Sequence, residues 1–127
     1  MDAGTHTFTC QQGDTFERVL ELHQNSFEGA TLPLDGFTAR MQIRDGIAGE
    51  VALELSTEAE SIEIEAEEGR IRLILEPAAT ATLSVDCDPG IFPPVKNYVY
   101  DLEITNPDGV VTTILRGYFS VIGGVTR

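Results

Sequence analysis

Hydrophobic and polar residues alternate with a period of two along most of the chain. The clearest stretch, Phe37–Arg44, has apolar side chains at its odd positions and polar or charged ones at its even positions. Successive side chains of a strand point to opposite faces of a sheet, so this pattern predicts a β-strand with one buried face. The same alternation predicts seven further strands: His6–Gln11, Thr15–His23, Val51–Ser56, Ser61–Glu65, Arg70–Leu75, Tyr98–Ile104 and Val110–Ile122. The last of these is partly apolar on both faces, which favours an interior or covered position.

Two turn motifs connect neighbouring strands of this set. Asn106–Gly109 has the sequence of a type I turn, with proline at its second position and glycine at its fourth, and predicts an antiparallel hairpin. Glu67–Gly69 predicts a second hairpin, in which the glutamates of Ser61–Glu65 would face the arginines of Arg70–Leu75.

Helix is almost absent from the pattern. The segment Glu76–Leu83, with proline near its start, predicts at most one short helical turn. Two longer loops are expected at Gln24–Gly36 and Asp86–Asn97, the second because its prolines cannot continue a strand. About seven or eight short strands with regular turns predict an all-β fold, an antiparallel immunoglobulin-like β-sandwich that forms a single domain over residues 1–127.

The charge of the chain restricts its partners. Eight Lys and Arg stand against 21 Asp and Glu, which gives a net charge of −13. Binding to a phosphate backbone depends on basic side chains, so we expect no nucleic-acid partner. Mimicry of DNA by spaced carboxylates is also disfavoured, because arginines interrupt the outward strand faces. No long apolar run and no signal peptide are present. We therefore expect synthesis in the cytoplasm without secretion, and no association with a membrane.

Residues suited to catalysis or metal binding are few. The two histidines, His6 and His23, fall on polar strand faces, and the glycine-rich, nucleophile-elbow and HExxH motifs are absent. We therefore expect no enzymatic activity, no cofactor and no metal site, although Asp86 and Asp88 share a loop that calcium would suit. A carboxylate-dependent glycan hydrolase is the enzymatic alternative. It requires a cleft with two carboxylates roughly 5–10 Å apart.

The two cysteines, Cys10 and Cys87, are too few for a disulfide framework or a closed zinc site. We expect two small, partly buried thiols, with a single bridge between them left open.

Apolar residues in the two long loops are the candidate partner contacts. Such side chains are unfavourable in water, so they either fold onto the core or contact another protein. The predicted contact residues are Phe27, Leu32, Ile91, Phe92, Pro93, Pro94 and Val95.

A series of short motifs occurs in order along nearly the whole chain. These are Gln12–Phe16, Leu34–Arg44, Gly69–Ile71, Tyr98–Ile104, Pro107–Gly109, Leu115–Gly117 and Val125–Arg127. The series resembles a family of small virion proteins of tailed phages and prophages. It is similar to the N-terminal immunoglobulin-like domain of phage baseplate upper proteins.

The resemblance implies a structural role in the virion and brings no catalytic residues. It implies an adaptor in the tail, baseplate or neck that connects to receptor-binding fibres through protein–protein contacts, as part of a homo- or hetero-oligomer. We expect a stand-alone subunit, because no fibre stem follows Arg127. A capsid decoration, or cement, protein is the alternative within the virion, since it too would be a small acidic β-domain.

Overall fold

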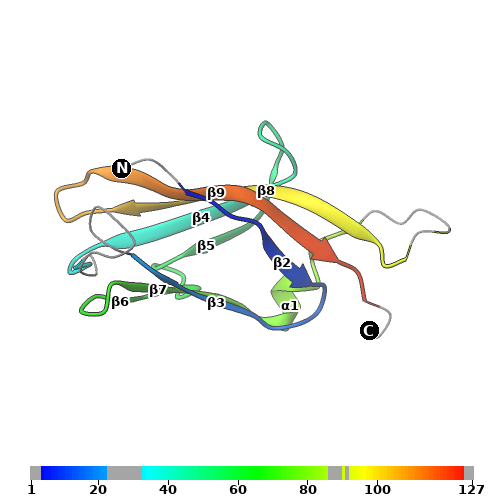
Figure 1. The fold of residues 1–127 in the computed structure, drawn as a ribbon, viewed down its shortest axis with the longest axis horizontal. Helices are drawn as coiled ribbons and strands as arrows, with labels where there is room; N and C mark the ends of the chain where they lie inside the picture. Colours follow the sequence, from blue (N-terminus) through cyan, green and yellow to red (C-terminus); the bar gives the residue numbers. More distant parts are fainter. Residues whose placement is uncertain (1–3, 23–32, 86–89, 91, 125–127) are drawn as a thin grey trace.

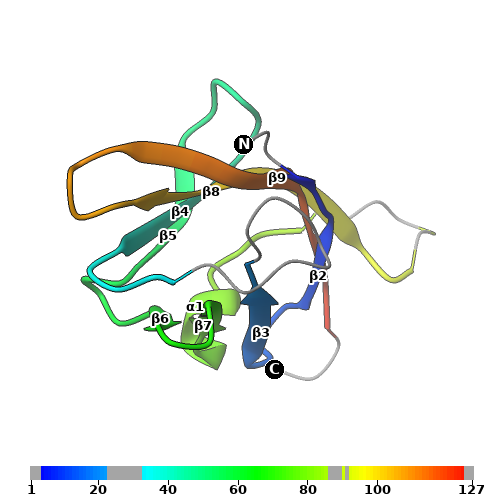
Figure 2. The same cartoon turned by 60° about the vertical axis from the view of Figure 1, so that its left-hand side comes forward.

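Two β-sheets pack face to face and enclose the core of the molecule (Figures 1 and 2). The computed structural model describes residues 4–22, 33–85, 90 and 92–124. Within this part there are nine strands and one helix, α1, which spans Pro77–Thr80. The all-β sandwich and the single helical turn predicted from the alternation are therefore confirmed. The helix found among the described residues is too short to cross a membrane.

The larger sheet has six strands in the order β1–β9–β8–β4–β5, with β2 also paired to β9. Their bounds are Gly4–Thr5 for β1, Phe8–Gln11 for β2, Thr38–Arg44 for β4, Val51–Ser56 for β5, Val95–Thr105 for β8 and Val111–Ile122 for β9. The long β8–β9 hairpin forms the centre of this sheet and closes at the predicted turn. There the Asn106 side chain accepts hydrogen bonds from the backbone N–H groups of Asp108 and Val110, both at 2.9 Å.

The smaller sheet has three strands in the order β3–β7–β6. They span Phe16–Glu21, Arg70–Leu75 and Ile62–Glu65 respectively. The predicted pairing of glutamates with arginines across β6 and β7 is confirmed, since Glu63 lies opposite Arg72 and Glu65 opposite Arg70. β3 adds Glu17 on the other side of the arginines, 3.6 Å from Arg72. The outer face of this sheet is therefore a ladder of alternating charges.

The strand order is that of an immunoglobulin-like sandwich. β5–β4–β8–β9 corresponds to strands C′, C, F and G of a variable-type domain, and β3–β7–β6 corresponds to B, E and D. The Tyr98 hydroxyl near the start of β8 donates a 2.8 Å hydrogen bond back to the carbonyl oxygen of Ser84, which ties β8 to the segment that follows α1.

The two short N-terminal strands depart from the antiparallel arrangement of the rest of the sandwich. β1 and β2 both run parallel to β9. β2 lies within the strand predicted at His6–Gln11, and β1 is an additional strand before it, which raises the strand number to nine. The break at His6 lies against Gly117 of β9, where a Cβ atom would overlap the His6 carbonyl oxygen. That oxygen accepts a 2.6 Å hydrogen bond from the Tyr100 hydroxyl. Burial raises the pKa of Tyr100 to about 12, so the hydroxyl remains a donor at neutral pH.

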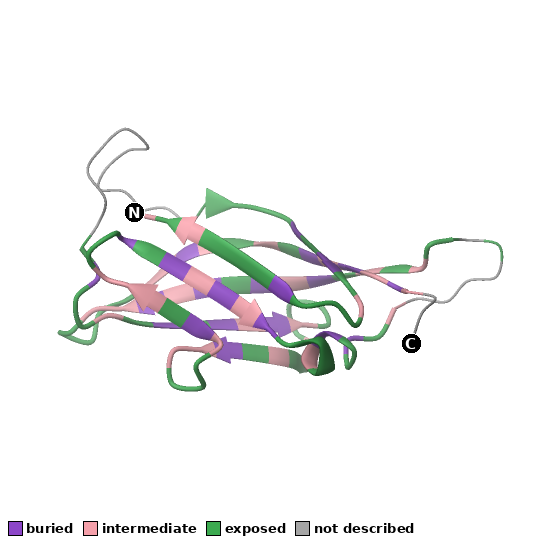
Figure 3. Ribbon diagram, turned by 90° about the horizontal axis from the view of Figure 1, so that it is seen from below, coloured by how far each residue is buried: buried purple, intermediate pink, exposed green. Residues whose placement is uncertain are grey.

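The core consists of the inward side chains of both sheets (Figure 3). Phe8 and Phe16, both predicted to be core residues, are 2% exposed, and their rings meet edge to face with centroids 5.8 Å apart. Phe119 of β9 completes the cluster, 5.2 Å from Phe16. Since Phe→Ala in a core costs about 3–5 kcal/mol, this cluster is a main source of stability. Leu20, also predicted for the core, is half-buried.

Helix α1 is attached to the turn between β2 and β3. Thr80, which is 0% exposed, accepts a 3.1 Å hydrogen bond from the Gly13 N–H and donates one of 2.7 Å to the Asp14 carbonyl oxygen. Gln12 of the same turn donates a 2.7 Å hydrogen bond to the Leu83 carbonyl oxygen. The helix therefore connects the end of β7 to the turn between the N-terminal strands β2 and β3.

The predicted loop over Asp86–Asn97 is wrong at its C-terminal end. β8 begins at Val95, because β9 extends to Ile122 and pairs with it. The carbonyl oxygen of Pro94 also accepts a 2.8 Å hydrogen bond from the Gly123 N–H. The prolines thus mark the last residues before the strand, and they do not prevent pairing of the residues that follow.

Candidate functional site

An exposed apolar segment, Phe92–Val95, lies where the chain enters β8 and includes four of the predicted contact residues. Phe92 is 74% exposed and Val95 is 40% exposed. Pro93 is exposed as well, whereas Pro94 is half-buried. The side chains of Phe92 and Val95 therefore do not belong to the core. The other predicted contact residues, Phe27, Leu32 and Ile91, lie outside the described residues.

The base of this segment is fixed to the sandwich. Val95 pairs with Ile122 at the end of the β8–β9 hairpin. The next residue, Lys96, places its ammonium group 2.9 Å from Asp45 Oδ2 and 5.1 Å from the centre of the Tyr98 ring. The sheet thus holds the C-terminal end of the apolar segment at a defined position, and contact with a partner at Val95 would need little further ordering of the backbone.

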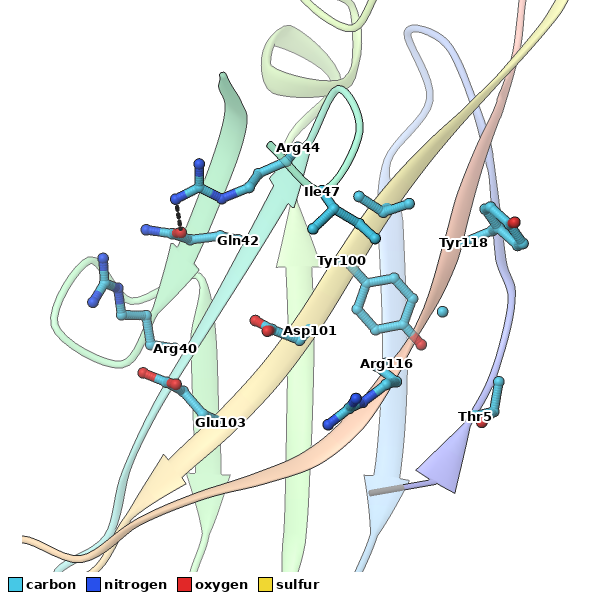
Figure 4. A pocket seen from close by; sticks show the side chains of 12 residues that line it. Thr5, Arg40, Gln42, Arg44, Ile47, Tyr100, Asp101, Glu103, Arg116 and Tyr118 are labelled. Atoms are coloured by element: carbon cyan, nitrogen blue, oxygen red, sulfur yellow. Dashed lines mark hydrogen bonds between the residues drawn. The ribbon is translucent and has the colours of Figure 1, made fainter. Parts of the chain in front are cut away.

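A shallow hollow of about 900 Å³ opens on the outer face of the larger sheet (Figure 4). Its floor comes from alternate residues of three adjacent strands. These are Arg40, Gln42 and Arg44 of β4, Val99, Asp101 and Glu103 of β8, and Arg116 and Tyr118 of β9. Strand register aligns them in rows, because Gln42 lies opposite Asp101 and Asp101 lies opposite Arg116.

Hydrogen bonds fix the β4 side of the hollow. Gln42 donates a 2.8 Å hydrogen bond to Glu54 Oε2 on β5 and accepts one of 2.8 Å from Arg44. Arg40 lies 3.3 Å from the same carboxylate. The hydrogen bonds from Gln42 and Arg40 lower the pKa of Glu54, which therefore stays ionised at neutral pH. The connected side chains have few alternative positions.

The side chains on β8 and β9 are available for other contacts. The carboxylates of Asp101 and Glu103 and the guanidinium of Arg116 make no hydrogen bond or ion pair with another side chain in the described part of the chain. Tyr118 is 56% exposed beside Val99, and Ile47 from the β4–β5 turn is 91% exposed at the same end. The hollow therefore combines unpaired charges with a small apolar area.

The remaining sequence candidates lie apart from both surfaces or outside the description. His6 is exposed, with its ring 4.7 Å from that of Phe8, and His23 is not among the described residues. No group of three or more His, Cys, Asp or Glu side chains suited to a metal ion occurs within residues 4–22, 33–85, 90 and 92–124. Asp86 and Asp88, the calcium candidates, fall outside those ranges.

Cys10 is a buried free thiol within the core. Burial raises its pKa to about 11, so the reactive thiolate is scarce at neutral pH. This agrees with the predicted small, buried thiol for Cys10. Cys87 lies outside the described residues.

The sequence analysis missed the hollow as a site. The alternation shows that Arg40 and Asp101 point outward from their strands, but it does not show that β4 lies beside the predicted hairpin of β8 and β9. Tyr118 lies in the strand that we expected to be interior. β9 is indeed interior, between β8 and the N-terminal strands, yet the exposure of Tyr118 and Val111 shows that its outer face is uncovered.

Comparison with known proteins adds no assignment: no protein-family model matches the chain, and no curated protein is significantly similar to it in sequence.

Proposed function

We propose that this protein is a structural virion subunit of a tailed phage or prophage, an adaptor in the tail, baseplate or neck that connects to receptor-binding fibres. The observation that carries the protein–protein contact is the exposed segment Phe92–Val95, held by the β8–β9 hairpin. The proposed location in a virion rests on the series of short sequence motifs that resembles small virion proteins.

The chemistry of the segment suits a protein partner. Phe92 and Val95 carry no charge, and apolar and aromatic side chains are enriched in the central part of protein interfaces. An exposed aromatic anchor of this kind contributes strongly when a partner pocket encloses it. Because like charges repel, a subunit of net charge −13 is expected to bind through an uncharged surface or to a basic partner.

The glycan hydrolase alternative is less well supported. Asp101 and Glu103 do share the hollow, but they are two residues apart on one face of β8 and approach a ligand from the same side. Glycoside cleavage needs carboxyl groups that flank the scissile bond. The arrangement suits binding better than cleavage.

Capsid decoration is the alternative role within the virion, and measurement of molar mass separates it from the adaptor role. The purified protein is measured by light scattering alone, mixed with the proteins encoded beside it, and mixed with empty capsids. The adaptor role predicts a monomer or small oligomer that forms a discrete complex only with a tail, neck or fibre protein. A protein that ignores these partners and coats capsids would contradict it.

A further inference from the structure

The hollow on the outer face of the larger sheet has a chemistry different from that of Phe92–Val95. Three arginines and two carboxylates line it, together with one amide and one exposed tyrosine. Arginine and tyrosine are enriched in the central part of protein interfaces, but aspartate and glutamate are depleted there. Because two carboxylates lie among the arginines, the hollow suits a ligand that can use hydrogen-bond donors and acceptors together.

We infer that this hollow binds an extended carbohydrate chain. A sugar hydroxyl both donates and accepts hydrogen bonds, so neighbouring hydroxyls fit a surface on which hydrogen-bond donors alternate with acceptors. Asp101 and Glu103 supply acceptor oxygens, and Arg116 supplies a planar set of donors. These three side chains make no side-chain pair with one another or with other described residues, which leaves their bonding capacity for a ligand.

Tyr118 supplies the apolar part of the site. Its ring is 56% exposed, and Val99 lies directly opposite it on β8. Ile47 from the β4–β5 turn adds a further apolar side chain at this end of the hollow (Figure 4). The C–H face of a pyranose ring packs on such a surface, while the ring's hydroxyls point along the sheet to the charged side chains.

The shape and the rigidity of the hollow favour a chain over a compact ligand. It extends across three neighbouring strands, so an elongated ligand can contact all of them at once. Gln42, Arg40 and Glu54 already hold one another in place, so binding on that side requires little ordering of side chains. A nucleic acid fits less well, because the two carboxylates would face its phosphates.

The test is direct binding of the purified full chain to an array of immobilised bacterial O-antigen chains and capsular polysaccharides, followed by titration of each hit. The variants Tyr118→Ala, Asp101→Asn and Arg116→Gln each alter an exposed side chain, and we expect each to weaken binding about tenfold. Val19→Ala, an equally exposed position on the other sheet, is the matched control and should bind like the wild type. Melting temperatures measured in parallel show that the variants remain folded.

Two results would overturn the inference: no polysaccharide binds at millimolar concentration, or the three variants bind like the wild type. If no polysaccharide binds and Tyr118→Ala abolishes a complex with a partner protein, the hollow is a protein-binding surface instead. Phe92→Ala separates this inference from the proposed function. It should leave polysaccharide binding unchanged, because Phe92 is not part of the hollow.

Discussion

At the scale of single residues, Thr80 shows how one buried hydroxyl positions a whole segment. It is the polar residue that is fully buried within the described part of the chain. Its hydroxyl satisfies the Gly13 N–H and the Asp14 carbonyl oxygen in the β2–β3 turn. Without it, both backbone groups would lose their partner within the protein.

Thr80→Val keeps the shape of the side chain and removes the hydroxyl. We expect it to lower the free energy of unfolding by about 0.5–1.5 kcal/mol, the net contribution of an intramolecular hydrogen bond, because the links to Gly13 and Asp14 are lost. Urea denaturation followed by circular dichroism measures this difference. Thr80→Ser is the matched control, since it keeps the hydroxyl, and it should cost less than Thr80→Val. Equal losses of stability for the two variants would contradict this account, because they would show that the methyl group of Thr80 contributes as much as its hydroxyl.

At the scale of elements, the two N-terminal strands depend on close approach to β9. The chain crosses Gly117 at His6, between the β1 and β2 pairings, and a Cβ at Gly117 would overlap the His6 carbonyl oxygen. That oxygen is also the acceptor for Tyr100. A side chain at this point would displace the backbone of the N-terminal segment.

Gly117→Ala is therefore expected to destabilise the protein by about 1–3 kcal/mol, the usual cost of overpacking. It should also speed hydrogen exchange at the His6 N–H, which donates a 3.0 Å hydrogen bond to the Arg116 carbonyl oxygen. The matched control is Gly4→Ala in β1, where a Cβ would make an ordinary 3.5 Å contact with Leu115. If Gly117→Ala were as stable as Gly4→Ala, close approach would not be what fixes the N-terminal strands.

Most of the elements could be predicted from the sequence, and so could the two pairs of neighbours joined by the hairpin turns Glu67–Gly69 and Asn106–Gly109, but the other neighbours could not. Alternation along Phe37–Arg44 locates β4 to within a residue, because one face of that strand is buried and the other is solvated. The partners of a strand depend on long-range packing that no local pattern records. The hollow therefore escaped prediction, since it exists only because β4, β8 and β9 lie side by side. The start of β8 at Val95 escaped for a different reason: the prolines just before it led us to expect a loop as far as Asn97.

At the scale of the whole molecule, the exposed apolar segment Phe92–Val95 contrasts with the high negative charge of the chain. Carboxylates dominate a chain of net charge −13, and the outer face of the smaller sheet neutralises part of this charge with its glutamate–arginine ladder. The segment Phe92–Val95 carries no charge and stands in solvent. This distribution keeps a free subunit soluble and leaves an uncharged contact for assembly.

The most direct test of the protein–protein account compares the wild type with the double variant Phe92→Ala/Val95→Ala. Light scattering gives the mass of each in the presence of the partner protein, and thermal melting gives its stability. We expect the wild type to form a discrete complex. The double variant should remain unassembled with a melting temperature close to that of the wild type, because both side chains are exposed. A double variant that assembles normally, or one that loses stability and assembly together, would contradict the account.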